Sequence, residues 1–360
     1  MKSVRVLILG SNDSTLISTI RTLQKSSKYD FTIFGFGSEN EFIERFYNVT
    51  LLRKSSSDLA LIHFLIDACQ KNKVEVIIPT SFEYLEPLCE HLEIFRSKNI
   101  EPAIPLTDPS LLEILSHRPT LFEYFNRVLS LNGPEYRISS TQQMLHEGAH
   151  SLGYPHKPIL FTPSHSFRGG NMKLVESSKD VRKLFFEKKP DTVYSTLHQF
   201  TNVLGVSFPE VTAIEFDCVT EYSVEVLCRK GITFAVLVYP SNPLSAKMDI
   251  RAALTKDQHY PAVEKIARRV IEGFGFSYSV CMRIWIDSEG NAKLVDVIPH
   301  LREDVILCFH GGVNFPELMI DMALQEFDYE YNPTIKWGLK MQQVWLELLS
   351  YQGDVWKTDL

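Results

Sequence analysis

A short loop near the middle of the chain gives the first sign of chemistry. Residues 166–171 read Ser-Phe-Arg-Gly-Gly-Asn and follow an apolar run that ends at Pro163. Glycines allow backbone N–H groups to come close to phosphate oxygens, and an arginine adds a forked, charged donor. Such a loop on its own is more often a surface turn. Arg168, Gly169 and Gly170 are therefore phosphate-binding candidates only together with the segments that accompany them.

A candidate hairpin carries the second group of charged residues. Residues 281–287 and 294–300 are rich in apolar side chains, and the residues between them include Ser288-Glu289-Gly290-Asn291, whose types are typical of a tight turn. Arg283 on the first strand and Asp296 on the second could form a cross-strand ion pair. That pairing and a role in ligand binding both remain open at this point.

Hydrophobic patterning predicts the elements that would position these residues. The first hundred residues alternate apolar runs with helix-like stretches, which favours βαβ units on a parallel sheet. The expected strands are 5–10, 31–36, 74–79 and 100–105, and the expected helices are 14–24 and 57–73. We expect residues 1–107 to form a doubly wound α/β domain. Gly10 ends the first strand without the GxGxxG spacing of dinucleotide sites, so a plain turn is favoured over an NAD(P) site.

The pattern changes at about Thr107. One helix is expected over 108–131, which includes His117 and Arg118, and another over 261–274. Short strands with tight turns between them predict an antiparallel α+β region with helices on one side. These strands are 159–162, 211–217, 222–228, 233–239, 280–286 and 292–298. We expect residues 108–330 to form one domain, with 331–360 as a C-terminal extension packed on it.

Four segments of this second region, in this order, resemble the ATP-grasp superfamily, and most of all its carbamoyl-phosphate-synthetase large-subunit branch. They are the strand and glycine loop of 152–172, the hinge-like 213–227, the hairpin 281–300, and the glycine turn and helix start of 310–318. The resemblance extends over nearly the whole chain. It implies a doubly wound domain followed by an ATP-grasp fold, in which two α+β subdomains clamp the nucleotide.

The resemblance also implies roles for acidic residues of the hinge. Glu215 would lie at the nucleotide, and Glu221 would accept hydrogen bonds from the ribose hydroxyls. Because Glu221 and Glu225 alternate with Tyr222 and Val224, both could instead line the polar face of an amphipathic strand. We expect ribose contact for Glu221 and the plain polar face for Glu225.

Two lysines that bind phosphate in the family are replaced in this chain. The lysine before the glycine loop corresponds to Thr162, although Lys157 lies five residues earlier and a shifted register could supply it. The lysine on the preceding helix corresponds to Arg118, which keeps the positive charge. Thr162 and Arg118 are thus the positions expected beside the phosphates.

The metal-binding hairpin departs further from the family pattern. Its first-strand ligand corresponds to Arg283, its glutamate to Asp296 and its asparagine to Ile298. The arginine that follows becomes His300. Magnesium prefers several oxygen ligands in near-octahedral geometry, so only Asp296 remains of an implied Mg²⁺ site. Two acidic neighbours could substitute as ligands or could simply be solvated, and these are Glu303 and Asp304.

Two functions fit this reading. The first is an ATP-dependent ligase that activates a small carboxylate as an acyl phosphate and joins it to an amine or similar nucleophile. Positioning and charge neutralisation dominate such phosphoryl chemistry, and the expected cations are Arg118, Arg168, Arg251 and Arg283. The second is a degenerate ATP-grasp module or partner subunit that binds nucleotide without turnover. The sequence names no substrate and leaves homo-oligomerisation open.

Composition excludes several other classes. The net charge is −7 and the pI about 5.9, which disfavours a nucleic-acid partner because such binding needs a basic surface. No run approaches the roughly 20 apolar residues of a membrane span, and the N-terminal run does not read as a signal peptide. Six scattered cysteines without a CxxC pair predict reduced, mostly buried thiols. We expect a cytoplasmic protein.

Overall fold

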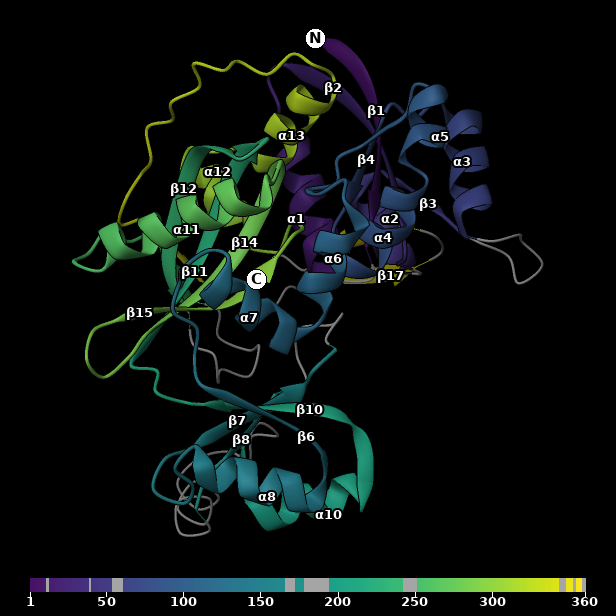
Figure 1. Cartoon of the computed structure of the whole chain (residues 1–360). Coiled ribbons are helices and arrows are strands. Elements are labelled where there is room, and N and C mark those ends of the chain that lie inside the picture. Colours follow the sequence, from purple (N-terminus) through teal and green to yellow (C-terminus); the bar gives the residue numbers. More distant parts are fainter. Residues whose placement is uncertain are drawn as a thin grey trace.

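The first third of the chain folds around a parallel sheet with helices on both faces (Figure 1). The strand order is β3-β2-β1-β4-β5, and every neighbouring pair is parallel. The elements are β1 (Lys2–Leu9), α1 (Asp13–Leu23), β2 (Tyr29–Phe36), α2 (Glu41–Tyr47), β3 (Thr50–Leu52), α3 (Leu61–Asn72), β4 (Val76–Pro79), the 3₁₀ turn η1 (Phe82–Tyr84), α4 (Leu85–Glu90), α5 (Leu92–Ser97) and β5 (Glu101–Pro102).

Successive side chains of β1 point to opposite faces of the sheet, and each face is covered by helices. Val6 and Ile8 pack in one core cluster with residues of α1, whereas Leu7 and Leu9 pack in another with residues of α3. Strands buried on both faces are typical of doubly wound sheets. The expected doubly wound fold of this region is therefore confirmed, although the last strand is shorter than the predicted 100–105. The domain bounds of 1–107 stay a prediction.

This computed structural model describes residues 1–10, 13–38, 40–53, 61–165, 172–177, 194–241, 251–342, 348–351 and 354–357. Within these residues, no helix is both long and apolar enough to cross a membrane.

A small lobe follows and lies apart from the rest in Figure 1. Its mixed sheet has the order β6-β10-β7-β8-β9, and its core cluster contains residues of this lobe alone, among them Leu145, Phe161 and Ala213. The segments are α6 (Pro109–Ser116), α7 (Arg118–Arg127), β6 (Tyr136–Thr141), α8 (Gln142–Ser151), β7 (Ile159–Pro163), β8 (Lys173–Val175), β9 (Tyr194–Ser195), α10 (Leu197–Leu204) and β10 (Ser207–Glu215). Of these, α6 and α7 pack on the body and lead into the lobe.

The expected single helix over 108–131 is wrong, because it is two helices. His117 is extended, with φ −119° and ψ 105°, and it separates α6 from α7. Pro119 provides the physical reason, since proline lacks an N–H and its ring clashes with the preceding turn of a continuous helix. The break makes Arg118 the first residue of a new helix.

The large antiparallel sheet has the order β12-β11-β14-β15. Its elements are β11 (Thr220–Arg229), β12 (Ile232–Ser241), β13 (Arg251–Ala253), α11 (Tyr260–Phe274), β14 (Tyr278–Ile286), β15 (Ala292–Ile298), α12 (Val305–His310) and α13 (Phe315–Ala323). Apolar residues of α11 such as Val263 and Val270 pack with Val224 and Val226 of β11. The other face of β11 therefore carries its remaining residues, which include Glu221 and Glu225. This confirms the predicted α+β region and the predicted turn between β14 and β15.

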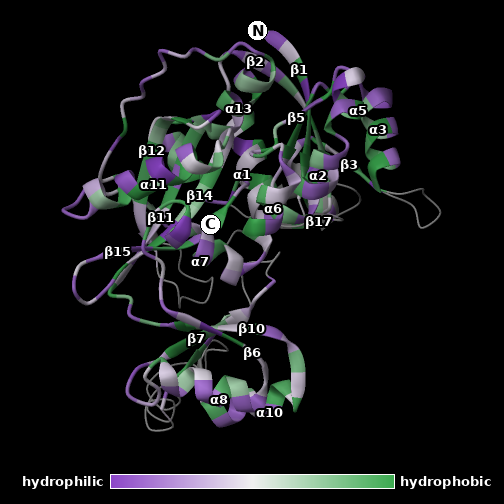
Figure 2. Cartoon of the chain, viewed as in Figure 1, coloured by the Kyte–Doolittle hydropathy of each residue, from purple (hydrophilic) through white to green (hydrophobic). Residues whose placement is uncertain are grey.

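The C-terminal residues contact two parts of the body. β16 (Lys340–Gln342) pairs with β13 beside the large sheet. β17 (Leu348–Tyr351) and β18 (Asp354–Lys357) form a hairpin, and β18 lies against α2 of the front sheet. Figure 2 shows apolar residues along the strands of both body sheets and a mixture of polar and apolar residues along α8 and α11, as expected of helices with one buried face.

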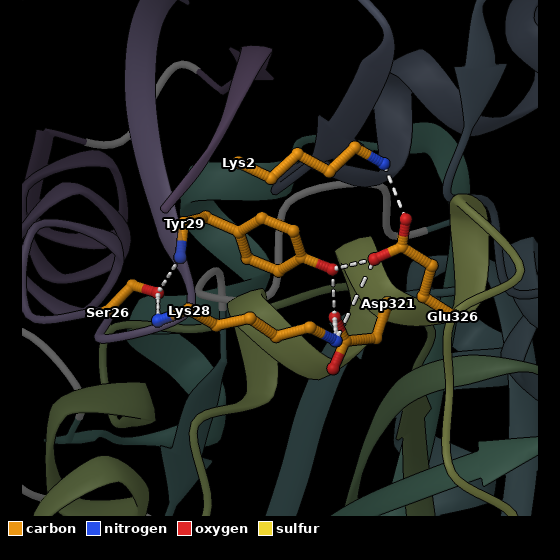
Figure 3. Close-up of polar contacts among 6 residues, drawn as sticks. All are labelled: Lys2, Ser26, Lys28, Tyr29, Asp321 and Glu326. Atoms are coloured by element: carbon orange, nitrogen blue, oxygen red, sulfur yellow. Dashed lines mark hydrogen bonds and ion pairs between the residues drawn. The ribbon is translucent and has the colours of Figure 1, made fainter.

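A polar cluster joins the front sheet to α13 (Figure 3). The Tyr29 hydroxyl contacts carboxylate oxygens of both Asp321 and Glu326, the latter at 2.8 Å. Lys28 pairs with Asp321 at 2.6 Å, and Lys2 pairs with Glu326. The first two strands are thus tied to the last long helix of the body.

Candidate functional site

Arg118 and Asp296 form the centre of the candidate site. Arg118 opens α7 with its side chain only 5% exposed, and its Nη2 donates to Asp296 Oδ2 at 3.2 Å. Its backbone N–H donates to the carbonyl of Ser164 at 2.9 Å. The Arg118 Nε is buried, and no hydrogen-bond partner for it is found within the described part of the chain. A buried guanidinium with an unused donor is suited to an anionic ligand.

Arg283 lies beside this pair on the large sheet. It is the cross-strand neighbour of Asp296 on β15 and of Ser223 on β11. Among the described residues, no ion pair joins Arg283 to Asp296, and the buried Nε of Arg283 lacks a hydrogen-bond partner. The guanidinium that pairs with Asp296 therefore comes from α7 rather than from across the hairpin. Arg118 binds this carboxylate directly, and Arg283 is its neighbour in the strand register.

These residues do not fit a magnesium ion. Asp296 is already paired with Arg118, and the neighbouring positions are Arg283 and the apolar Ile298. Burial lowers the pKa of His300 to about 4, so this residue adds no positive charge near pH 7. Within the described ranges, no three acidic, histidine or cysteine side chains lie close enough to hold a metal. The hairpin therefore offers Asp296 as a lone carboxylate already paired with an arginine, which does not match the several oxygen ligands that magnesium prefers.

Glu221 lies on the same face of the large sheet as Arg283, and both oxygens of its carboxylate accept hydrogen bonds. Its side chain is buried, its Oε2 accepts from Trp285 Nε1 at 2.8 Å, and its Oε1 accepts from the Ser241 hydroxyl at 2.9 Å. The ribose contact expected for Glu221 stays a prediction. Each carboxylate oxygen retains one lone pair for a further donor.

Glu215 and Thr162 lie on adjacent strands of the small lobe. Glu215 ends β10 and accepts from Lys157 Nζ at 2.7 Å. This hydrogen bond raises the pKa of Lys157 above its ordinary value. Thr162 on β7 is buried and pairs in register with Thr212. Lys157 thus points to the hinge carboxylate, and the cation beside Asp296 is Arg118.

Glu225 is fully buried two residues beyond Ser223 on β11. Its Oε1 accepts from the Tyr239 hydroxyl at 3.3 Å, and its Oε2 has no hydrogen-bond partner within the described residues. Burial, followed by the charge of Asp304, raises the pKa of Glu225 to about 7. Asp304 is itself buried, which raises its pKa. The sequence predicts Glu225 on the polar face of an amphipathic strand. That prediction does not account for its complete burial.

Some predicted site residues fall outside what the structure describes. The loop residues Arg168, Gly169 and Gly170 lie in the segment 166–171, which is outside the described ranges. Arg251 begins β13, and only its backbone is described. The roles of these four residues stay predictions.

Three solved enzyme structures resemble the chain. N5-carboxyaminoimidazole synthetase from Staphylococcus aureus is 12% identical, with a TM-score of 0.62 over 93% of this chain and 81% of that one. Biotin carboxylase from Campylobacter jejuni, solved with an ATP complex, is 13% identical, with a TM-score of 0.63 over 92% and 73%. L-amino acid ligase from Bacillus licheniformis is 14% identical, with a TM-score of 0.58 over 92% and 78%.

The chain has an ATP-grasp fold. At these identities the likeness shows the fold alone. No protein-family model and no curated protein sequence matches the chain. The carbamoyl-phosphate-synthetase branch stays a prediction, because the three neighbours belong to other enzymes.

Sequence reasoning missed one group of the ATP-grasp chain, at the junction of α7 with the small lobe. Glu210 on β10 binds the His117 ring at 2.8 Å, and His117 forms an isolated antiparallel bridge with His165. The signal was Pro119, which marks the break that frees His117 from a helix. Glu210 itself had no local signal, since it lies 93 residues from its partner.

Proposed function

We propose that this chain binds ATP between the small lobe and the polar face of the large sheet, with arginine side chains at the phosphates in place of magnesium. The observation that carries the proposal is the buried Arg118, which pairs with Asp296 and keeps an unpartnered Nε, with Arg283 as the cross-strand neighbour of Asp296. Supporting it, the fold is shared with a biotin carboxylase solved with an ATP complex and a synthetase solved with ADP.

Charge supports binding of a polyphosphate at this position. Arg118 and Arg283 supply two cations, with Asp296 paired to Arg118 and Asp304 interacting electrostatically with Arg283, and each arginine has a buried Nε without a hydrogen-bond partner among the described residues. Arginine pairs with phosphate through parallel N–H donors, and such charge-assisted bonds are about twice as strong as neutral ones. Partial burial increases their effect by lowering the local dielectric.

Calorimetric titration with ATP tests the proposal. Wild-type protein should bind ATP with similar affinity in excess EDTA and in excess magnesium. Arg118→Ala should weaken binding about tenfold or more, because a buried charged hydrogen bond contributes about 1.5–3 kcal/mol. Arg127→Ala is the matched control, since Arg127 lies at the far end of the same helix with an exposed side chain paired only to Glu123 among the described residues. No ATP binding by the wild type would contradict the proposal.

Asp296→Asn separates the arginine site from a metal site. Removing the carboxylate charge frees Arg118 for phosphate, so ATP affinity should hold or increase in EDTA. A metal site at Asp296 would give the opposite result, with affinity that depends on magnesium and disappears in the variant.

A second candidate function is ligase activity, favoured by the fold shared with L-amino acid ligase. In that reaction the γ-phosphoryl group of ATP passes to a substrate carboxylate, which gives ADP and an acyl phosphate, and an amine then displaces phosphate. Purified protein with ATP and a panel of small carboxylates and amines should then release ADP and phosphate. Binding of ATP without release across the panel would favour the binding module or partner subunit.

A further inference from the structure

Two histidines meet where α7 joins the small lobe. His117 occupies the extended break before α7, and His165 follows β7. An isolated antiparallel bridge joins the two residues, and their ring centroids are 4.4 Å apart at an angle of 38°. At the same junction, the backbone N–H of Arg118 donates a hydrogen bond to the carbonyl of Ser164. The two histidines therefore lie beside the backbone of Arg118, the first residue of α7.

The His117 ring is held by hydrogen bonds on both sides. Its Nε2 lies 2.8 Å from Glu210 Oε1, and its Nδ1 lies 2.7 Å from Thr120 Oγ1. Burial alone would raise the pKa of Glu210, but hydrogen bonds from His117 and Ser164 bring that pKa below its ordinary value. Glu210 is thus a carboxylate near neutral pH, so Nε2 donates to it. Nδ1 can then accept from Thr120, and neutral His117 has no unused group.

His165 is in a different situation. Its side chain is exposed, and no described residue forms a hydrogen bond with either of its ring nitrogens. It packs against the His117 ring, and the residue before it, Ser164, accepts the backbone hydrogen bond from Arg118. Arg168 lies three residues further along the chain, outside the described ranges.

We propose that His165 binds a phosphate group of the nucleotide in its protonated form, and that His117 is the positioning residue that holds the ring. The proposal rests on the proposed ATP binding and adds a third cation to it. An imidazolium donates a charge-assisted hydrogen bond to a phosphate oxygen, whereas a neutral imidazole contributes much less. The protein would therefore release nucleotide more readily as pH rises.

The surrounding charges set the sign of this dependence. The titratable groups near His165 among the described residues include His117, whose ring packs against it, and Glu210 on β10. Glu210 is anionic near neutral pH and interacts electrostatically with both histidines. A bound phosphate adds negative charge beside His165 and favours the imidazolium, so binding and protonation reinforce each other.

The test compares ATP affinity in EDTA at about pH 6 and about pH 8, which bracket the usual titration range of imidazole. The variants are His165→Gln, which removes the charge, and His165→Lys, which keeps it at both values. At the lower pH, wild type and His165→Lys should bind alike, with His165→Gln about tenfold weaker. At the higher pH, wild type should approach His165→Gln. Protonation of ATP affects the wild type and the variants equally, so it does not change their relative affinities at a given pH.

Two controls complete the test. His198→Gln alters an exposed histidine of the same lobe that contacts Asn202, and it should behave as wild type. His117→Gln should reduce affinity at the lower pH and have no additional effect in the His165→Gln background. The proposal is overturned if His165→Gln binds as wild type at both pH values, or if His165→Lys follows the wild-type profile. Failure of the wild type to bind ATP at all would overturn the proposed function as well.

Discussion

Glu221 and Glu225 lie four residues apart on one face of β11 and meet different surroundings. Glu221 has a donor for each oxygen, from Trp285 and Ser241. Glu225 has the Tyr239 hydroxyl at one oxygen and no partner within the described residues at the other. Burying a carboxylate costs free energy unless it is hydrogen-bonded, so the same residue type should respond oppositely to neutralisation at these two positions.

The first prediction concerns Glu221. Glu221→Ala leaves the buried Trp285 N–H without an acceptor, and we expect the free energy of unfolding to fall by about 2–4 kcal/mol. Glu221→Gln is the matched control, because its amide can accept from Trp285 and donate to Ser241, so its loss should stay below about 1 kcal/mol. Urea unfolding measures both. Equal stability of the two variants would show that these bonds do not stabilise the sheet.

The second prediction uses the raised pKa of Glu225. Between the ordinary value of 4.5 and about pH 7, the folded state keeps a proton that the unfolded state has lost. Stability should therefore fall as pH rises through this window, by about 3 kcal/mol in total. Glu225→Gln should remove that fall and be more stable than wild type above pH 7. Glu123→Gln, on the exposed side of α7, should keep the wild-type profile measured by urea unfolding. A fall that persists in Glu225→Gln would assign it to another group.

The hairpin β14–β15 is the element that aligns the site. Asp287 holds its turn by accepting from the backbone N–H groups of Glu289 at 3.0 Å and Asn291 at 2.7 Å, and it pairs with Lys293 at 3.4 Å. Gly290 in the turn has a φ of +85°, which favours glycine. The register that this turn sets brings Arg283 opposite Asp296.

The third prediction is therefore that Asp287→Ala weakens both stability and binding. Loss of the buried carboxylate that accepts from two backbone N–H groups should cost about 2–3 kcal/mol in urea unfolding. ATP affinity should fall as well, since the β14–β15 pairing that positions Arg283 is less firmly held. Glu289→Ala, at an exposed position of the same turn, should change stability by less than about 0.5 kcal/mol. A stable Asp287→Ala variant that binds ATP normally would contradict this view of the hairpin.

Elements with local signals could be predicted from the sequence, and those that depend on distant partners could not. The strands and turn of the β14–β15 hairpin follow from alternation and Gly290. Arg118 could be placed beside phosphates only through resemblance, because its partner Asp296 lies 178 residues away. The break at His117 was signalled by Pro119, but the pairing of His117 with His165 and Glu210 depends on how the small lobe folds back. The short β3, β8 and β9 have too few residues for a periodic pattern.

At the scale of the whole molecule, the front sheet and the large sheet share their cores, and one face of the small-lobe sheet joins them. One cluster contains Leu7, Val224 and Leu160 of β7, and another contains both Ile8 and Leu237. The other face of the small-lobe sheet packs with α8 in a separate cluster. A shared core favours cooperative opening of the two body sheets, whereas α8 and its cluster can open separately.

The last prediction tests this division at the polar cluster of Figure 3. Burial and hydrogen bonds to Asp321 and Glu326 raise the pKa of Tyr29, so its hydroxyl remains a donor between two carboxylates. Tyr29→Phe removes that donor, which should cost about 1.5–3 kcal/mol because the bonds are to charged groups. Hydrogen exchange should then accelerate together in β1, β2 and α13, while α8 stays as in wild type. Tyr124→Phe, which loses one neutral bond to the Gly273 carbonyl, is the control and should change stability by about 1 kcal/mol or less. Acceleration confined to β2 would mean that the front sheet opens independently of the body, and the shared core would then not make it one cooperative unit.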